Sequence, residues 1–159
     1  MSAELPPVAR ALAALGVPCR VFRHPGPVAS LEQAARERGQ TPEQVIRSIL
    51  FRLSSAAYVM VLIAGSRQVA WPALRRRLGA SRLSLASADE VRACTGYEIG
   101  AVSPFGLPGP LRVLADQAVF ASEEISIGSG QRGVTVILRA ADLRAALPDL
   151  EIGEFAAPA

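Results

Sequence analysis

The stretch VIRSILFRLSSAAYVMVLIA, residues 45–64, contains two β-rich apolar runs. The first extends from Val45 to Leu53, and the second, from Tyr58 to Ala64, is almost continuously apolar. Runs of this length and composition are typical of strands that are buried on at least one face. We therefore predict a β-hairpin that turns through Ser54-Ser55-Ala56.

Shorter segments on both sides of this hairpin predict helices and further strands. The predicted helices are Pro7 to Leu15, Leu31 to Arg38, Pro72 to Leu78, Ser87 to Cys94 and Ala140 to Leu147. The other predicted strands are Cys19 to His24, Leu111 to Leu114, Val119 to Ala121, Glu124 to Ile127 and Val134 to Leu138. Because most of these strands cluster late in the chain, we expect an α+β fold with a mixed, mostly antiparallel sheet that short helices partly cover.

Length and composition limit the class of protein. The chain has 159 residues, of which 50% are hydrophobic and 19% are charged, so we expect one globular domain over residues 1–159. No run approaches the roughly 18 apolar residues of a membrane span. Since the N-terminus also lacks a basic, apolar leader, we expect a cytoplasmic protein with no membrane partner. Two cysteines and one histidine predict neither a disulfide framework nor a metal site, and we expect no cofactor.

The basic residues are all arginines. The chain contains 17 basic residues and no lysine, and its net charge is +3. Such a balance permits a polyanionic partner, although an arginine bias can also follow from genome composition. Arg75, Arg76 and Arg77 form a cluster on a predicted helix, which is either a contact for nucleic-acid phosphates or a solvated helical face.

A long loop rich in glycine and proline, from Thr95 to Pro110, contains the segment Gly100-Ala101-Val102-Ser103-Pro104. Small residues beside a proline expose backbone amides along a rigid path, where the amides can hold a carbonyl, carboxylate or phosphate oxygen. The alternative is a tight structural crossover without a ligand. Loops of this length inside compact domains are usually functional.

A second glycine-rich turn, from Ile127 to Gly133, contains Gly128, Ser129, Gly130 and Arg132. Its hydroxyl and guanidinium groups can bind an oxyanion or a phosphate, but a simple hairpin connection explains the same residues. The functional interpretation gains weight only if this turn lies next to the Gly100–Pro104 segment.

Arg47 lies inside the first run of the hairpin. Alternation along a strand places Val45, Arg47 and Ile49 on one face and Ile46 and Ser48 on the other. An unpaired buried cation is costly, so Arg47 either reaches solvent at a sheet edge or meets an anion.

Other catalytic patterns are absent from the sequence. His24 ends a predicted strand before Pro25-Gly26-Pro27 and can lie near a site, but no cysteine or serine pattern predicts a triad with it. The sequence also contains no phosphate-binding Walker loop and no dinucleotide-binding fingerprint.

Taken in order, these segments resemble the YbaK/ProX family, the freestanding relatives of the editing domain that is inserted in bacterial prolyl-tRNA synthetases. The similarity covers nearly the whole chain. It rests on the strand ending at His24, Gln44 to Leu50, Ala64-Gly65, Thr95-Gly96-Tyr97, Gly100 to Gly106 and Gly130-Gln131-Arg132-Gly133.

The resemblance implies a partly open barrel with the fold of that editing domain, and the hydrolysis of mischarged aminoacyl-tRNA. The substrate it implies is a small amino acid such as cysteine or alanine on tRNA for proline, with transient contact to an aminoacyl-tRNA synthetase. The family carries a functional lysine where this chain has Arg47, followed by a residue that corresponds to Ser48. Arginine keeps the charge of lysine but does not readily exchange a proton.

The chemistry expected from the resemblance needs no protein nucleophile. Water attacks the ester, the backbone amides of Gly100 and Ala101 stabilise the oxyanion, and Arg47 anchors an anion. The residues expected to bind substrate are His24, Ser48, Val102, Ser103, Pro104, Gly128, Ser129, Gly130 and Arg132, with Arg75, Arg76 and Arg77 as tRNA contacts. The competing hypothesis is a non-catalytic module that binds aminoacyl-tRNA, an aminoacyl-adenylate or a synthetase, and in which the change from lysine to arginine has removed activity.

Overall fold

A computed structural model of the protein describes residues 4–53 and 57–158. The predicted hairpin is confirmed as the antiparallel pair β2 (Ile46–Leu53) and β3 (Tyr58–Ala64), whose register pairs Arg47 with Ile63. The turn predicted at Ser54-Ser55-Ala56 lies outside the described residues.

This hairpin is the centre of a five-stranded sheet with the order β4-β2-β3-β5-β8. The added strands are β4 (Leu83–Leu85), β5 (Arg112–Asp116) and β8 (Glu151–Gly153). β4 pairs antiparallel with β2, whereas β5 pairs parallel with both β3 and β8. The sheet is therefore mixed, as its sequence pattern predicts.

A second, three-stranded antiparallel sheet has the order β1-β7-β6. Its strands are β1 (Arg20–Arg23), β6 (Glu124–Gly128) and β7 (Val134–Arg139). The two sheets meet at a parallel bridge between Val45 and Ser126. The main apolar core contains Leu12, Leu62 and Ile125, and it joins both sheets.

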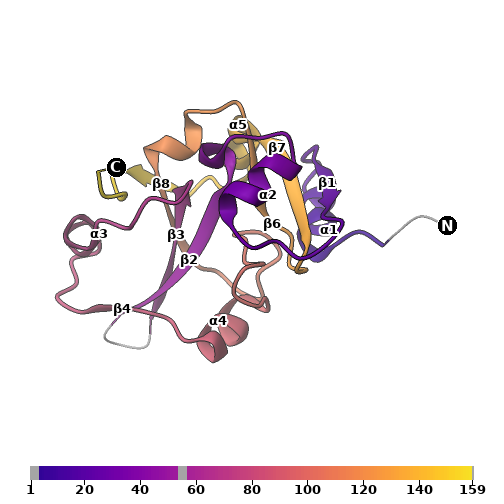
Figure 1. Ribbon diagram of the computed structural model, residues 1–159. Helices are drawn as coiled ribbons and strands as arrows, with labels where there is room; N and C mark the ends of the chain where they lie inside the picture. The colour runs from indigo at the N-terminus through magenta and orange to yellow at the C-terminus, as the bar shows by residue number, and fades with distance from the viewer. Residues whose placement is uncertain (1–3, 54–56, 159) are drawn as a thin grey trace.

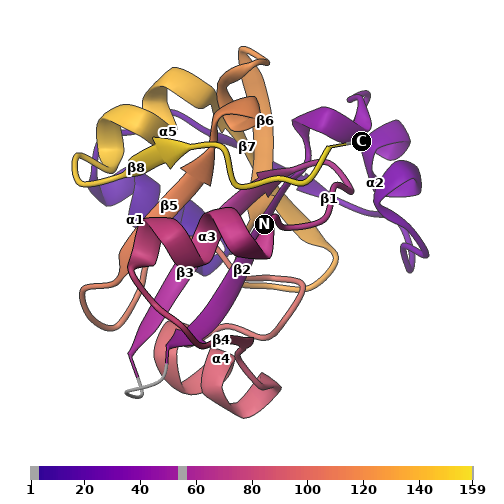
Figure 2. The same ribbon diagram turned by 90° about the vertical axis from the view of Figure 1, so that its left-hand side faces the viewer.

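In the described ranges, five α-helices surround the sheets (Figure 1). They are α1 (Pro7–Ala14), α2 (Leu31–Glu37), α3 (Trp71–Leu78), α4 (Ala88–Thr95) and α5 (Ala140–Ala146). Figure 2 shows α3 lying across β2 and β3. A second apolar cluster, which includes Phe51, Leu74 and Phe155, joins α3 to that face of the sheet. None of the helices in the described part of the chain is long and apolar enough to cross a membrane.

The α+β prediction is confirmed, and three local differences have physical causes. The strand predicted at Val119 to Ala121 is wrong, because residues 117–120 form a 3₁₀ turn that the Asp116 carboxylate caps by accepting from Ala118 N at 3.0 Å. The other oxygen of Asp116 accepts from Phe155 N at 2.8 Å, which ties the turn to the C-terminal segment. The strands β4 and β8 are not predicted from the sequence. Each is only three residues long, and such short runs carry no clear alternation.

Candidate functional site

A cavity of about 760 Å³ opens between the two sheets, beside the first half of β2. Its walls come from the segment before α2, from α2 itself, from β2, from the loop at residues 99–102 and from the β6–β7 hairpin. Figure 1 shows these elements converging near the middle of the molecule, on the side away from α3. Segments far apart in the sequence therefore build one site.

The cavity gathers many of the residues that the sequence predicts for a site. Those that line it are His24, Arg47, Ser48, Gly100, Val102, Gly128 and Arg132. Those that do not line it are Ala101, Ser103, Pro104, Ser129 and Gly130. Arg75, Arg76 and Arg77 lie on α3, which packs on the other face of the five-stranded sheet.

The two glycine-rich segments lie side by side at one wall of the cavity. Gly130 N donates to Ala101 O at 2.9 Å. A Cβ on Gly128 would lie 2.8 Å from the carbonyl carbon of Ala101 and would overlap Val102 O. The second segment is therefore a hairpin connection, as the simpler interpretation holds, and it also supports the Gly100–Pro104 segment.

Buried hydrogen bonds hold the loop around Gly100 in shape. Tyr97 Oη donates to Phe105 O at 2.7 Å, and burial raises the pKa of this phenol. Ser103 Oγ accepts from Phe105 N at 3.2 Å. Ala101 N donates to Glu98 O at 2.9 Å, so the Ala101 amide, a predicted oxyanion donor, is engaged inside the loop. The amides of Gly100 and Val102 make no hydrogen bond to another described residue.

Ser129 belongs to the same supporting structure. It is fully buried, and its Oγ lies 2.7 Å from Val134 O and 3.1 Å from Gln131 N. The hydroxyl closes the β6–β7 turn, and Ser129 is not among the residues that line the cavity.

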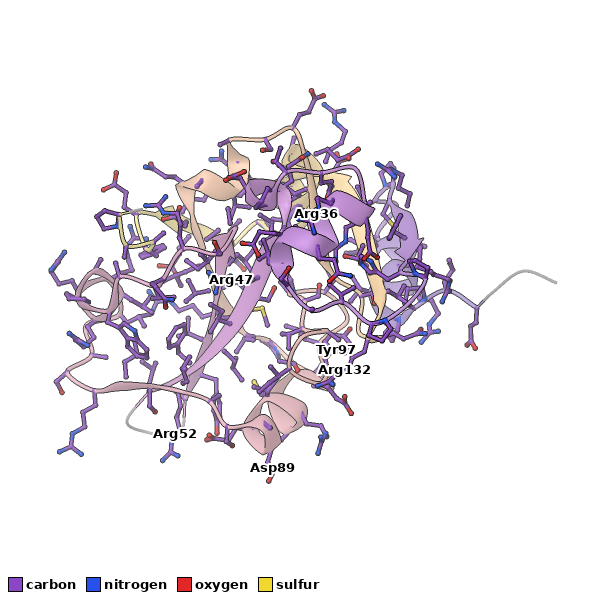
Figure 3. All side chains as sticks on the ribbon, viewed as in Figure 1. Arg36, Arg47, Arg52, Asp89, Tyr97 and Arg132 are labelled. Atoms are coloured by element: carbon purple, nitrogen blue, oxygen red, sulfur yellow. The ribbon has the colours of Figure 1, made fainter. Side chains whose placement is uncertain are left out.

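Arg47 occupies an arrangement that differs from both sequence interpretations. Its Nε donates to Gly65 O at 2.7 Å and its Nη2 donates to Arg67 O, in the turn after β3. Burial lowers the pKa of this guanidinium from its usual value. Figure 3 shows Arg47 beside β2, and Arg52 at the opposite end of that strand. The cation therefore binds backbone carbonyls, and its Nη1 makes no hydrogen bond to the described residues.

Ser48, the next residue, lines the cavity and has an unpaired hydroxyl group. Val45 O accepts from Gly65 N, whereas Leu50 O accepts from Ala86 N. Odd-numbered residues of β2 therefore bond to β3, and even-numbered residues point their N–H and C=O away from it. β4 pairs only with residues 51–53, and β6 meets β2 at Val45, so no strand pairs with Ser48 on the side that faces away from β3. Its Oγ is buried and has no hydrogen-bond partner in the described chain, which usually costs about 1–3 kcal/mol.

Arg38, which the site prediction missed, provides a second fixed cation at the cavity wall. Its Nε donates to His24 Nε2 at 3.1 Å, and its Nη1 donates to Ser126 Oγ at 2.9 Å. Since His24 Nε2 accepts, its Nδ1 carries the proton and donates to Glu37 Oε1 at 2.8 Å. Burial lowers the pKa of Arg38. Hydrogen bonds from His24, which has the larger effect, and from Gln33 lower the pKa of Glu37.

A signal for Arg38 is present in the sequence. Ala34 and Ala35 are the buried residues of α2, and Arg38 follows them by four and three positions. It therefore lies on the apolar face of that helix, where an arginine needs a partner.

The charged residues that line the cavity are all arginines. They are Arg38, Arg47 and Arg132, and the lining contains no aspartate or glutamate. Arg132 lies at the exposed rim and pairs with Glu98 at 3.3 Å. The site therefore combines an electropositive wall with free backbone donors, which suits an anionic ligand that carries a carbonyl group.

Comparison with known proteins gives a consistent result. The aminoacyl-tRNA editing domain family matches residues 25–146. The multifunctional Ser/Thr-tRNA deacylase ProXp-y of Escherichia coli (strain K12) is 31% identical over 140 residues, which cover 85% of this chain and 83% of that protein. The proline–tRNA ligase of Bacillus cytotoxicus is 30% identical over 104 residues, which cover 65% of this chain but only 18% of the ligase.

A solved structure described as a candidate trans-editing enzyme for prolyl-tRNA synthetase has the same fold. It superposes with a TM-score of 0.87 at 23% identity, covering 98% of this chain and 100% of the other.

Proposed function

This chain belongs to the aminoacyl-tRNA editing domain family, of which the YbaK/ProX proteins are the freestanding members, and on that premise we propose that it is a deacylase acting in trans on mischarged aminoacyl-tRNA. The observation that carries the proposal is the cavity itself. It brings three arginines together with the free amides of Gly100 and Val102, and its lining contains no carboxylate. The 3′ end of an aminoacyl-tRNA offers phosphates to the cations and an ester carbonyl to the amides.

The chemistry that fits these groups is attack by water on the ester carbonyl. The carbonyl carbon gains the water oxygen, the developing oxyanion is stabilised by backbone amides, and the ribose oxygen leaves with a proton. Gly100 and Val102 are the donors proposed here, because the Ala101 amide is occupied by Glu98 O. The ribose hydroxyl or the amino group of the substrate assists the proton transfer, since no triad is present.

Arg47 is proposed as an anion anchor through the one nitrogen, Nη1, that makes no hydrogen bond to the described residues. Its other bonds fix the guanidinium to the turn after β3. The orientation of the cation is therefore set before substrate binds, which lowers the entropic cost of anchoring.

The substrate class proposed is a small amino acid. Cysteine and alanine on tRNA for proline follow from the family, and serine and threonine follow from the name of the E. coli relative. A wall formed by Gly100 and Val102 selects by size. Pockets of this kind separate side chains that differ by one methylene by only about 1–3 kcal/mol, so we expect several small esters to be hydrolysed.

The test is a deacylation time course. tRNA for proline is charged with cysteine, alanine or proline, and cognate tRNAs carry serine or threonine. The wild type, Arg47→Ala and Arg47→Lys are compared, with Arg52→Ala as the control at the exposed end of the same strand. We expect turnover of small esters by the wild type and by Arg52→Ala, and its loss in Arg47→Ala.

The opposite result favours the non-catalytic module. Binding of aminoacyl-tRNA without turnover of any ester, followed by a gain of activity in Arg47→Lys, would mean that the replacement of lysine removed catalysis while the fold and the cavity were kept.

A further inference from the structure

The first half of β2 has an open strand edge inside the cavity. At one end of this edge the bridge between Val45 and Ser126 joins β2 to β6. At the other end Ala86 N donates to Leu50 O at 3.0 Å. Ser48 lies between these two points, no strand pairs with it on this side, and its Oγ lacks a partner in the described residues. The strand pairing along this edge is thus interrupted around Ser48.

A residue on such an edge has a defined partner geometry. In an antiparallel sheet, two directly opposite residues exchange both of their backbone hydrogen bonds, because the N–H and C=O of each point the same way. The aminoacyl group of a charged tRNA carries an amino group and a carbonyl on one Cα, as a residue of a strand does. It can therefore satisfy both backbone groups of one strand residue.

We propose that Ser48 is a main-chain template for the aminoacyl group: its C=O accepts from the α-amino group of the substrate, and its N–H donates to the ester carbonyl. This inference rests on the proposed deacylase function. It goes beyond it by naming the group that positions the substrate, and it assigns this positioning to the backbone of Ser48.

The charges in the cavity support this assignment. An α-amino group is a hydrogen-bond donor and is cationic when protonated, but the cavity lining provides arginines and no carboxylate. The partner that remains is a carbonyl oxygen, and that of Ser48 lies on an edge of β2 where no strand pairs with it. Directly opposite residues also place their side chains on the same face, so the side chain of the substrate lies beside the orphaned Oγ of Ser48.

Template recognition predicts how turnover depends on each group. Recognition through the backbone does not depend on the amino acid side chain, so it serves every small ester equally. Discrimination is then left to the walls, including Gly100 and Val102. Loss of the Ser48 N–H lowers the rate for all esters by a similar factor, whereas loss of a wall contact changes their ratio.

The first experiment removes the N–H. Ser48→Pro deletes a donor that is not part of the β2–β3 ladder, and proline is tolerated where a strand N–H faces away from its neighbours. We expect kcat/KM to fall at least tenfold for alanine, cysteine and serine esters alike. Ser48→Ala keeps the backbone groups and should show a clearly smaller fall. Leu85→Pro is the matched control, because Leu85 lies on the outer, exposed edge of β4 and outside the cavity.

The second experiment removes the amino group from the substrate and uses only the wild type. Alanyl-tRNA is compared with propionyl-tRNA, which lacks the α-amine, and each rate is divided by that of spontaneous hydrolysis. We expect the enzymatic enhancement to fall at least tenfold for the propionyl ester. If Ser48→Pro does not fold, as the absence of cooperative thermal unfolding would show, this comparison of substrates still tests the proposal.

An equal rate enhancement for the alanyl and propionyl esters would overturn the proposed role of Ser48. A loss of kcat/KM in Ser48→Ala as large as that in folded Ser48→Pro would overturn it as well. Failure of the proposed function looks different, because the wild type would then hydrolyse none of the esters.

Discussion

The two halves of β2 are built from similar residues and have different roles. From Phe51 to Leu53 the strand pairs with β3 on one side and with β4 on the other. Phe51 is fully buried and packs edge-on against Trp71, with ring centroids 5.1 Å apart. From Ile46 to Ile49 no strand of the five-stranded sheet pairs with the second side, and these residues line the cavity. One half of β2 is therefore paired on both sides, whereas the other half is the part that we propose binds the substrate.

The same contrast separates neighbouring side chains. Arg47 points to carbonyl oxygens and is held by them, whereas the Oγ of Ser48 has no hydrogen-bond partner in the described part of the chain. A closed, satisfied region contributes to stability, and an open, unsatisfied one keeps polar groups available for a ligand. Mutations in the two halves should thus have separable effects on stability and on turnover.

Phe51→Ala tests the closed half and should have the largest effect on stability. Truncating a fully buried phenylalanine costs about 3–5 kcal/mol, because apolar contacts are lost and a cavity is left. Chemical denaturation measures the change in the free energy of unfolding. Turnover per folded molecule should change little, and a large loss of turnover in fully folded protein would contradict the separation of the two halves.

Gly128→Ala tests the wall opposite the open half. The added methyl group would overlap Val102 O, so the Gly100–Pro104 segment must shift. Overpacking of this kind costs about 1–3 kcal/mol, and we expect at least a tenfold loss of kcat/KM. Gly109→Ala is the control, since a Cβ at that position meets no atom within 4 Å. Unchanged kinetics in Gly128→Ala would show that the loop tolerates displacement.

Arg38→Met tests whether the second cavity cation acts by its charge. This variant removes the hydrogen bonds to His24 and Ser126, and we expect a loss of about 1–3 kcal/mol in stability. Its affinity for tRNA, measured by filter binding at several salt concentrations, should fall and depend less steeply on salt. Arg38→Lys should retain the salt dependence. An equal loss of salt dependence in both variants would contradict a role for charge.

Tyr97→Phe tests the hydrogen bond that holds the loop around Gly100 in shape. The variant keeps the ring but loses the hydrogen bond to Phe105 O, 2.7 Å long, and leaves that carbonyl without this donor. We expect a loss of about 1 kcal/mol in the free energy of unfolding. If the activation free energy calculated from kcat/KM rises by more than the free energy of unfolding falls, the Tyr97 hydroxyl also shapes the cavity.

The smallest predicted effect is the dependence of stability on pH that Glu37 causes. Its pKa is lowered in the folded state by the bonds from His24 and Gln33, so its contribution to stability is fully present above the unfolded value of 4.5 and is lost as the pH falls through the folded value. Melting temperatures of the wild type and Glu37→Gln, measured from pH 3 to pH 7, should therefore converge at the acid end. A difference that stays constant with pH would contradict this linkage.

The sequence predicted the parts of the fold that depend on local patterns. The hairpin at residues 45–64, most helices and the two glycine-rich segments follow from periodicity and from glycine and proline, whose effects act within a few residues. The strand predicted at Val119 to Ala121 is wrong because the Asp116 carboxylate caps a turn there, and that carboxylate is held by the distant Phe155. Contacts between remote segments carry no local signal.

The candidate site divides in the same way. Alternation alone places Arg47 and Ser48 on opposite faces of β2, and the glycine-rich composition marks the loop at Gly100. Tertiary structure alone decides that β4 stops at the partner of Phe51, that β6 joins at Val45, and that the edge between them is open. It also decides that Arg38 meets His24. The physical reason is that side-chain direction is set by neighbouring residues, whereas the pairing of a strand edge is set by segments far away in the chain.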